Sequence, residues 1–193
     1  MANSERFSFD TKEYLNTFYC ILDQMVREMT TANLAESISN NFIVQMIPHH
    51  QAAIQMSENL LKYTDWCPLK TIAEQIIEEQ TKGIAEMEAL LGDCSCLLNC
   101  DKDICLYDRR TCQIMEVMFT DMEFARQTDS IDANFMFEMI PHHLGAVSMA
   151  ENALHYEVCD GLVPILESII TSQRRGVRQM QGLLRRIGYS MQA

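Results

Sequence analysis

The amino-acid sequence predicts an all-α protein built from two copies of a three-helix unit. Apolar residues recur at the i, i+3, i+4 spacing of amphipathic helices, and no segment alternates apolar and polar residues as a strand would. Residues 14–91 also recur as residues 107–184 without a gap, and the pentapeptide Met-Ile-Pro-His-His appears in both copies, 93 positions apart. We therefore expect two similar units, each covering an apolar face of the other.

The duplication divides the chain into four expected parts. They are a polar leader at 1–12, a first repeat at 13–91, a cysteine-rich linker at 92–106 and a second repeat at 107–193.

Composition narrows the possible partners. The 193 residues are 48% hydrophobic, which is enough for a substantial core, and the net charge is −12. This charge argues against nucleic acid and anionic membranes and favours cations such as metal ions. No apolar run reaches the roughly 20 residues of a membrane span, and the N-terminus has no signal-peptide pattern. These features predict a cytoplasmic protein.

The first repeat predicts three helices, at residues 11–33, 39–63 and 69–91. Ser37 or Ser39 is suited to cap the second helix, because a hydroxyl can accept the free N–H groups of the first turn. Pro68 suits the first turn of the third helix, and Gly92 is expected to end it.

The second repeat predicts the same three helices, at residues 107–127, 130–156 and 163–187, with the last ending near Gly188. The third helices of the two repeats carry opposite charge, which indicates either a contact between the repeats or two solvated faces. One helix has Glu74, Glu78, Glu79, Glu86 and Glu88, and the other has Arg174, Arg175, Arg178, Arg185 and Arg186.

The repeated pentapeptide is the main candidate site. Helical spacing places both imidazoles and both flanking thioethers on one wall of each second helix. Pro48 removes a backbone N–H inside the first of these helices, so a kink is expected there. Methionines of the third helices can reach the same region. The candidate metal ligands are Met46, His49, His50, Met56 and Met87, with Met139, His142, His143, Met149 and Met180.

Imidazole and thioether donors together suit Cu(I) best, because soft ligands select soft metals. Neither copy contains HExxH or an ExxH pair, which argues against a zinc protease and a di-iron carboxylate centre. The alternative is that the histidines satisfy buried backbone groups and the methionines fill the core.

The eight cysteines form a second candidate feature. In a cytoplasmic protein we expect them to be reduced, which favours metal or redox chemistry over disulfides. The linker spacing matches neither a zinc ribbon nor a ferredoxin, although dense thiolates can hold Cu(I) or zinc. A flexible reduced loop is the alternative. Cys20 and Cys112 are expected to be buried. The possible thiolate site consists of Cys94, Cys96, Cys100 and Cys105.

The repeated pattern resembles a known family. Each copy reads Phe-x3-Met-Ile-Pro-His-His-x2-Ala-x2-Met, followed by Gln-x3-Ile/Val-x2-Met-x2-Leu-Leu. This is similar to the bacterial domain-of-unknown-function family 305, over residues 37–91 and 130–184. The resemblance implies a ferritin-like helical bundle and copper binding through the ten candidate ligands. The family often carries an acidic residue at the positions of Gly83 and Gly176.

These patterns predict a copper-binding protein for storage, buffering or delivery, with a metal ion as its partner. Two alternatives remain. The first is a metal- or thiol-dependent oxidoreductase that uses the same histidines with the cysteine-rich linker. The second is a structural protein in which charged helices and cysteines mediate a homo-oligomer while the histidines only pack.

Overall fold

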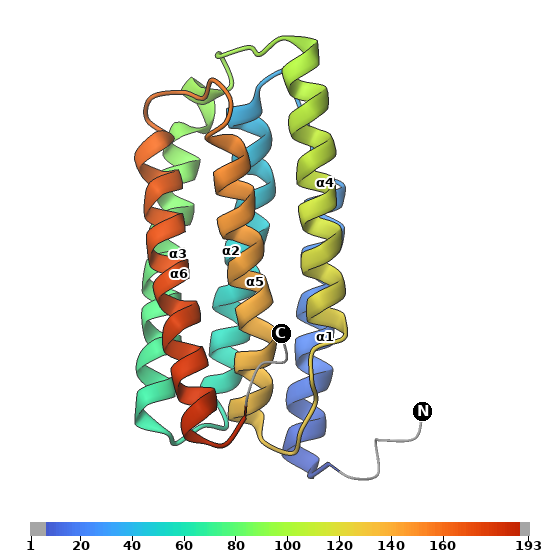
Figure 1. Cartoon of the computed structure of the whole chain (residues 1–193), viewed down its shortest axis with the longest axis vertical. Coiled ribbons are helices and arrows are strands. Elements are labelled where there is room, and N and C mark those ends of the chain that lie inside the picture. Colours follow the sequence, from blue (N-terminus) through green and yellow to red (C-terminus); the bar gives the residue numbers. More distant parts are fainter. Residues whose placement is uncertain (1–6, 190–193) are drawn as a thin grey trace.

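The computed structural model describes residues 7–189, and this part of the chain contains six helices and no strand (Figure 1). The helices run along a common long axis, which confirms the prediction of an all-α, ferritin-like bundle. They are α1 (Phe9–Thr30), α2 (Ile38–Leu61), α3 (Cys67–Cys94), α4 (Asp101–Glu123), α5 (Ile131–Ala153) and α6 (Val163–Arg186).

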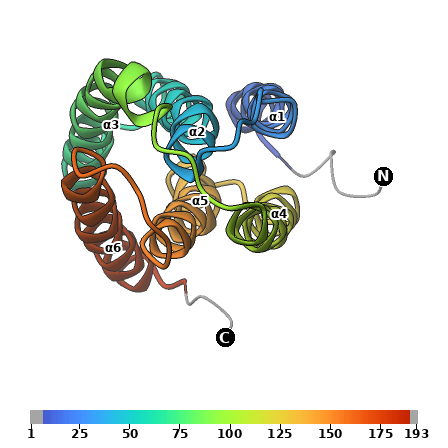
Figure 2. The same ribbon diagram turned by 90° about the horizontal axis from the view of Figure 1, so that it is seen from above.

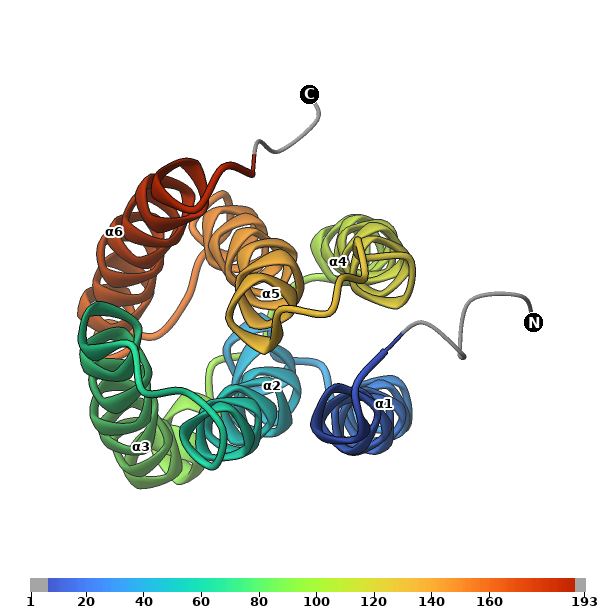
Figure 3. The same cartoon turned by 90° about the horizontal axis from the view of Figure 1, so that it is seen from below.

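The two central helices, α2 and α5, lie side by side (Figures 2 and 3). Within each repeat, the second helix packs on the first and the third: α2 on α1 and α3, and α5 on α4 and α6. The α2–α5 contact is the largest between the repeats. The contacts between α3 and α6 and between α1 and α4 are smaller. Both copies of the pentapeptide therefore lie on the helices through which the repeats meet.

The repeats share local structure as well as topology. Ser37 and Ser130 are the N-cap residues of α2 and α5, and each hydroxyl accepts a backbone N–H of the first turn. Asn41 and Asn134 each donate their side-chain amide to the backbone carbonyl six residues earlier and accept the N–H of the same residue. These repeated residues fix the loops that lead into the pentapeptide helices.

Two helix boundaries differ from the sequence-based expectation. Helix α3 continues past Gly92 to Cys94, which is fully buried, so Gly92 does not end the helix. A glycine inside a helix costs only about 1 kcal/mol relative to alanine, which packing of the next turn can offset. Helix α4 begins at Asp101, so Cys105 lies on a helix instead of a loop. Gly188 does follow α6, with a φ of 82°.

The expectation that all cysteines are reduced is wrong for Cys94 and Cys159, which form a disulfide. Their Cα atoms lie 5.4 Å apart, within the range that a disulfide spans. The extra turn of α3 brings Cys94 to the loop between α5 and α6, so the disulfide links the two repeats. Cys20 and Cys112 were expected to be buried, but both are exposed because they lie on the outer faces of α1 and α4.

None of the helices in residues 7–189 combines the length and the apolar character needed to cross a lipid bilayer.

Candidate metal centre

All ten candidate ligands lie in the core of the bundle, and none is more than 2% exposed. Eight come from α2 and α5, while Met87 comes from α3 and Met180 from α6. Burial separates these side chains from bulk solvent, but it is also what core-filling methionines would show. The polar atoms of the histidines therefore carry more information than the burial of the sulfurs.

His49 and His142 meet where α2 crosses α5. Their ring centroids are 3.6 Å apart, and the rings are inclined by 31°. The Nε2–H of His49 donates to the backbone carbonyl of His142, and the Nε2–H of His142 donates to the carbonyl of His49, both at 3.2 Å. A carbonyl oxygen can only accept, so each Nε2 carries the proton. The Nδ1 atom of each ring then presents its lone pair.

His50 and His143 face the third helices. A Cβ atom at Gly83 would lie 3.0 Å from Cδ2 and 3.1 Å from Nε2 of His50, and a Cβ at Gly176 would lie equally close to His143. A side chain larger than that of glycine at these positions would meet the imidazole in its present position and would require each ring to shift by a few tenths of an ångström.

The Nδ1 atoms of all four histidines are buried and have no hydrogen-bond partner within residues 7–189. Each such atom costs the fold roughly 1–3 kcal/mol in lost hydration. Buried polar atoms without a partner are rare in proteins, and a ligand is one accepted reason for them. The repeat presents the same orphaned nitrogen four times.

Burial keeps the four imidazoles neutral. It lowers the pKa of His49 to about 4 and the pKa of His143 to about 3. The pKa values of His50 and His142 are also lowered, first by burial and then by the neighbouring histidines. Neutral imidazole is the form that binds metals, so the site needs no deprotonation at neutral pH.

The described residues contain no group of three or more His, Cys, Asp or Glu side chains placed to hold one metal ion. The ring centroids of His49 and His50 are 6.0 Å apart, as are those of His142 and His143. A metal centre at these histidines therefore needs donors of another type, and the buried methionines of the same helices provide thioether sulfur.

The four linker cysteines do not form a common site within residues 7–189. Cys94 is bonded to Cys159, while Cys96, Cys100 and Cys105 are free and exposed.

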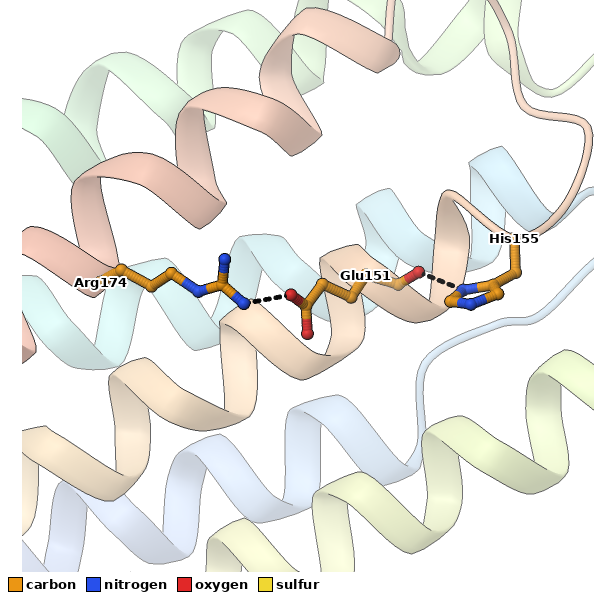
Figure 4. Close-up of polar contacts among 3 residues, drawn as sticks. All are labelled: Glu151, His155 and Arg174. Atoms are coloured by element: carbon orange, nitrogen blue, oxygen red, sulfur yellow. Dashed lines mark hydrogen bonds and ion pairs between the residues drawn. The ribbon is translucent and has the colours of Figure 1, made fainter.

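His155, the fifth histidine, lies outside the centre, in the turn after α5. Its Nδ1–H donates to the backbone carbonyl of Glu151 at 2.6 Å, and the carboxylate of Glu151 pairs with Arg174 of α6 (Figure 4). His155 is exposed. It therefore provides a natural control for experiments on the other four histidines.

One buried acidic group, Glu138, was not among the residues predicted from the sequence. Glu138 of α5 is 2% exposed and accepts a hydrogen bond from the Tyr14 hydroxyl at 2.6 Å. Burial raises the pKa of Glu138 well above its usual value. The equivalent position in the first repeat is Gln45. The feature of the sequence that could have revealed this buried group is a single carboxylate inside the apolar run of α5.

The profile of the domain of unknown function DUF305 matches residues 20–91 and, in a second match, residues 40–184. The chain belongs to this family. The overlapping matches fit two tandem DUF305 units. No curated protein matched the chain.

Two solved structures have a fold similar to that of this chain. A DUF305 fragment from Deinococcus radiodurans is 22% identical, with a TM-score of 0.57, and the match covers 80% of this chain and 98% of the fragment. CopM, in a silver-bound form obtained by soaking, is 28% identical, with a TM-score of 0.58. That match covers 78% of this chain and 97% of CopM.

Proposed function

We propose that this DUF305 protein binds a soft monovalent metal ion, with Cu(I) preferred, and serves in its storage, buffering or delivery. The proposed donors are the four pentapeptide histidines and the six methionines Met46, Met56, Met87, Met139, Met149 and Met180. The observation that carries the proposal is the set of four buried Nδ1 atoms that lack a partner.

The chemistry of the donors supports a soft ion. Thioethers are uncharged and lose little when they are buried, whereas a carboxylate site for a hard cation would carry a large desolvation cost. The described residues do not assemble His, Cys, Asp or Glu in groups of three or more, as zinc or iron sites do. A soft ion would satisfy the orphaned nitrogens.

The likeness to silver-bound CopM supports the same class of ion, because silver(I) and copper(I) are both soft monovalent cations. CopM is 28% identical to this chain over most of both proteins.

Equilibrium metal analysis tests the proposal. Protein purified without a histidine tag would be alkylated at its six exposed cysteines and then titrated with Cu(I) against a competing chelator. We expect stoichiometric binding in this thiol-blocked protein. If it binds no copper above the level of a histidine-free control protein, the proposed function is wrong.

Paired variants then locate the donors. Met46→Leu with Met139→Leu keeps the volume of the core and removes two sulfurs. Each of the two changes should cost less than about 1.5 kcal/mol, so the fold should survive. We expect at least tenfold weaker Cu(I) binding. His155→Ala is the matched control and should bind Cu(I) as the parent protein does.

The linker cysteines are no part of this proposed site. Cys94 is engaged in the disulfide, and Cys96, Cys100 and Cys105 remain exposed.

A further inference from the structure

A groove between α3 and α6 leads from the surface to one of the pentapeptide histidines. Its cavity has a volume of about 470 Å³, and its lining includes His50, Gln80 and Gly83 on one side and Gln173 on the other. Helices α3 and α6 contact each other far less than each contacts its neighbour in the same repeat. This weak contact leaves the groove open. We call this cavity the α3–α6 groove.

The floor of the α3–α6 groove is polar and only partly satisfied. Gln80 is 4% exposed and Gln173 is 2% exposed. Within residues 7–189, the side-chain oxygen of Gln80 and both polar atoms of the Gln173 amide have no hydrogen-bond partner. Together with His50, these amide oxygens offer neutral donors to a cation that has lost part of its water.

An ion pair crosses the groove. Glu79 of α3 pairs with Arg175 of α6, and both residues line the cavity. Within residues 7–189 it is the single ion pair that joins these two helices.

The repeat provides no second crossing pair. The position equivalent to Arg175 is Lys82, which also lines the groove but pairs at 3.4 Å with Glu86 of its own helix. The position equivalent to Glu79 is Ser172, which carries no charge. The crossing is therefore a feature of one pair of residues, and the duplication supplies a matched control.

We propose that the α3–α6 groove is the route by which the metal ion reaches His50. We further propose that the Glu79–Arg175 ion pair closes this route until the pair breaks. This inference rests on the proposed function. A cation that enters the groove comes near the guanidinium of Arg175, which is part of the lining. The pair is about half exposed, and exposed ion pairs contribute little to stability, so it can open at low cost.

The kinetics of Cu(I) uptake test whether the ion pair closes the route. Cu(I) would be transferred from a chromogenic chelator to thiol-blocked protein, under conditions in which the rate is proportional to protein concentration. Arg175→Gln removes the ion pair and one positive charge, and we expect Cu(I) uptake to be about three- to tenfold faster. The equilibrium stoichiometry should not change, because Arg175 is not a proposed ligand.

Glu79→Gln separates the effect of the ion pair from the effect of the net charge of the groove. This change frees Arg175 from its partner but makes the groove less acidic. If the ion pair closes the route, this variant should take up Cu(I) faster. If only charge attraction controls the rate, it should take up Cu(I) more slowly. Lys82→Gln removes the equivalent positive charge without a crossing pair, and we expect less than a twofold change. Slower uptake by Glu79→Gln, or equal acceleration by Lys82→Gln and Arg175→Gln, would show that the ion pair does not close the route.

A blocking variant tests the route itself. Ser168 is exposed and lines the groove, so Ser168→Trp should slow uptake about tenfold while the final stoichiometry is kept. Its equivalent, Gln75, lies outside this lining and borders a separate pocket of α3 and α6. Gln75→Trp should therefore leave the rate unchanged. Equal rates for both variants would exclude the groove as the route.

Failure of this inference can be told from failure of the proposed function. If the parent protein binds no Cu(I) at equilibrium, the proposed function fails. If it binds Cu(I) stoichiometrically while the groove variants leave the rate unchanged, only the route fails. Thermal melting of each variant confirms that the changes at these exposed positions leave the fold intact.

Discussion

His49 and His142 donate hydrogen bonds to each other's backbone carbonyls, and their rings stack with centroids 3.6 Å apart. Their positions are equivalent in the two repeats. The contact disfavours protonation of both rings at once, because two imidazolium ions this close would repel each other, and burial lowers the pKa of each ring. It also fixes the tautomer that leaves each Nδ1 free. The duplication thus creates a structural contact and a potential ligand pair from the same residues.

Acid should destabilise the protein strongly. The pKa of a free histidine is about 6.5, whereas the folded values are about 4 for His49 and about 3 for His143. Below pH 6.5 these histidines bind protons in the unfolded chain but stay neutral in the folded protein. The contribution of these histidines to stability is therefore full above pH 6.5 and falls, by up to about 1.4 kcal/mol per pH unit for each buried histidine, until the folded value is reached.

Denaturant unfolding between pH 7.5 and 4.5 measures this loss. The slope should exceed that of a single histidine, since His50 and His142 also have lowered pKa values. A flat stability profile across this range would contradict the burial of the four imidazoles.

Alanine at Gly83 should behave unlike alanine at another helical glycine. Nothing lies within 4 Å of a Cβ at Gly92, so Gly92→Ala should stabilise the protein by up to about 1 kcal/mol. At Gly83 the new methyl group meets the buried ring of His50 at 3.0 Å. Gly83→Ala should therefore be less stable than Gly92→Ala by at least about 1 kcal/mol, and Cu(I) binding should weaken.

Thermal melts and Cu(I) titrations of the two variants check this prediction. Equal stabilisation by both changes, with unaltered affinity, would show that His50 is free to move.

Sequence reasoning located the helices because periodicity and capping act locally. Ser37 caps α2 and Pro68 lies in the first turn of α3, as their side chains dictate. The prediction that the helix ends at Gly92 was wrong because Cys94, two residues further on, is buried and bonded to the other repeat. A residue 65 positions away could not be paired with Cys94 from the linker pattern.

The sequence placed the candidate residues on their helices but could not predict how they are arranged. The spacing of His49 and His50 placed both on α2, yet it did not show that His49 meets the other repeat while His50 faces α3. Recurrence alone also selects structural residues. Asn59, for example, recurs as Asn152 because each donates to the backbone carbonyl of a first-helix tyrosine.

Replacing Glu138 with glutamine should stabilise the protein at neutral pH. The pKa of the folded carboxyl is raised by burial, so Glu138 keeps its proton in the fold. Above about pH 4.5 the unfolded chain loses this proton, and stability falls as pH rises towards the folded pKa. Glu138→Gln removes this dependence and retains an acceptor for the Tyr14 hydroxyl, as Gln45 shows that the equivalent site tolerates an amide.

Unfolding experiments at pH 4 and pH 8 measure the effect. The gain of Glu138→Gln over the parent should be larger at pH 8. A variant that is less stable than the parent at pH 8 would indicate that the carboxylate is charged and needed.

Loss of the Cys94–Cys159 disulfide should destabilise the fold without removing metal binding. A link across 65 residues stabilises a protein by about 4 kcal/mol through the entropy of the unfolded chain. Cys94→Ser with Cys159→Ser should lower the unfolding free energy by about this amount, and the Cu(I) stoichiometry of thiol-blocked protein should stay the same. Cys67→Ser, which removes a free exposed thiol, is the control.

Nitrogen-15 NMR of the imidazoles during Cu(I) or Ag(I) titration tests metal binding by the pentapeptide histidines most directly. In thiol-blocked protein, we predict that the Nδ1 resonances of His49, His50, His142 and His143 shift with stoichiometric metal while those of His155 do not. Unchanged Nδ1 resonances at saturating metal would show that these nitrogens only pack in the core, and would contradict the account.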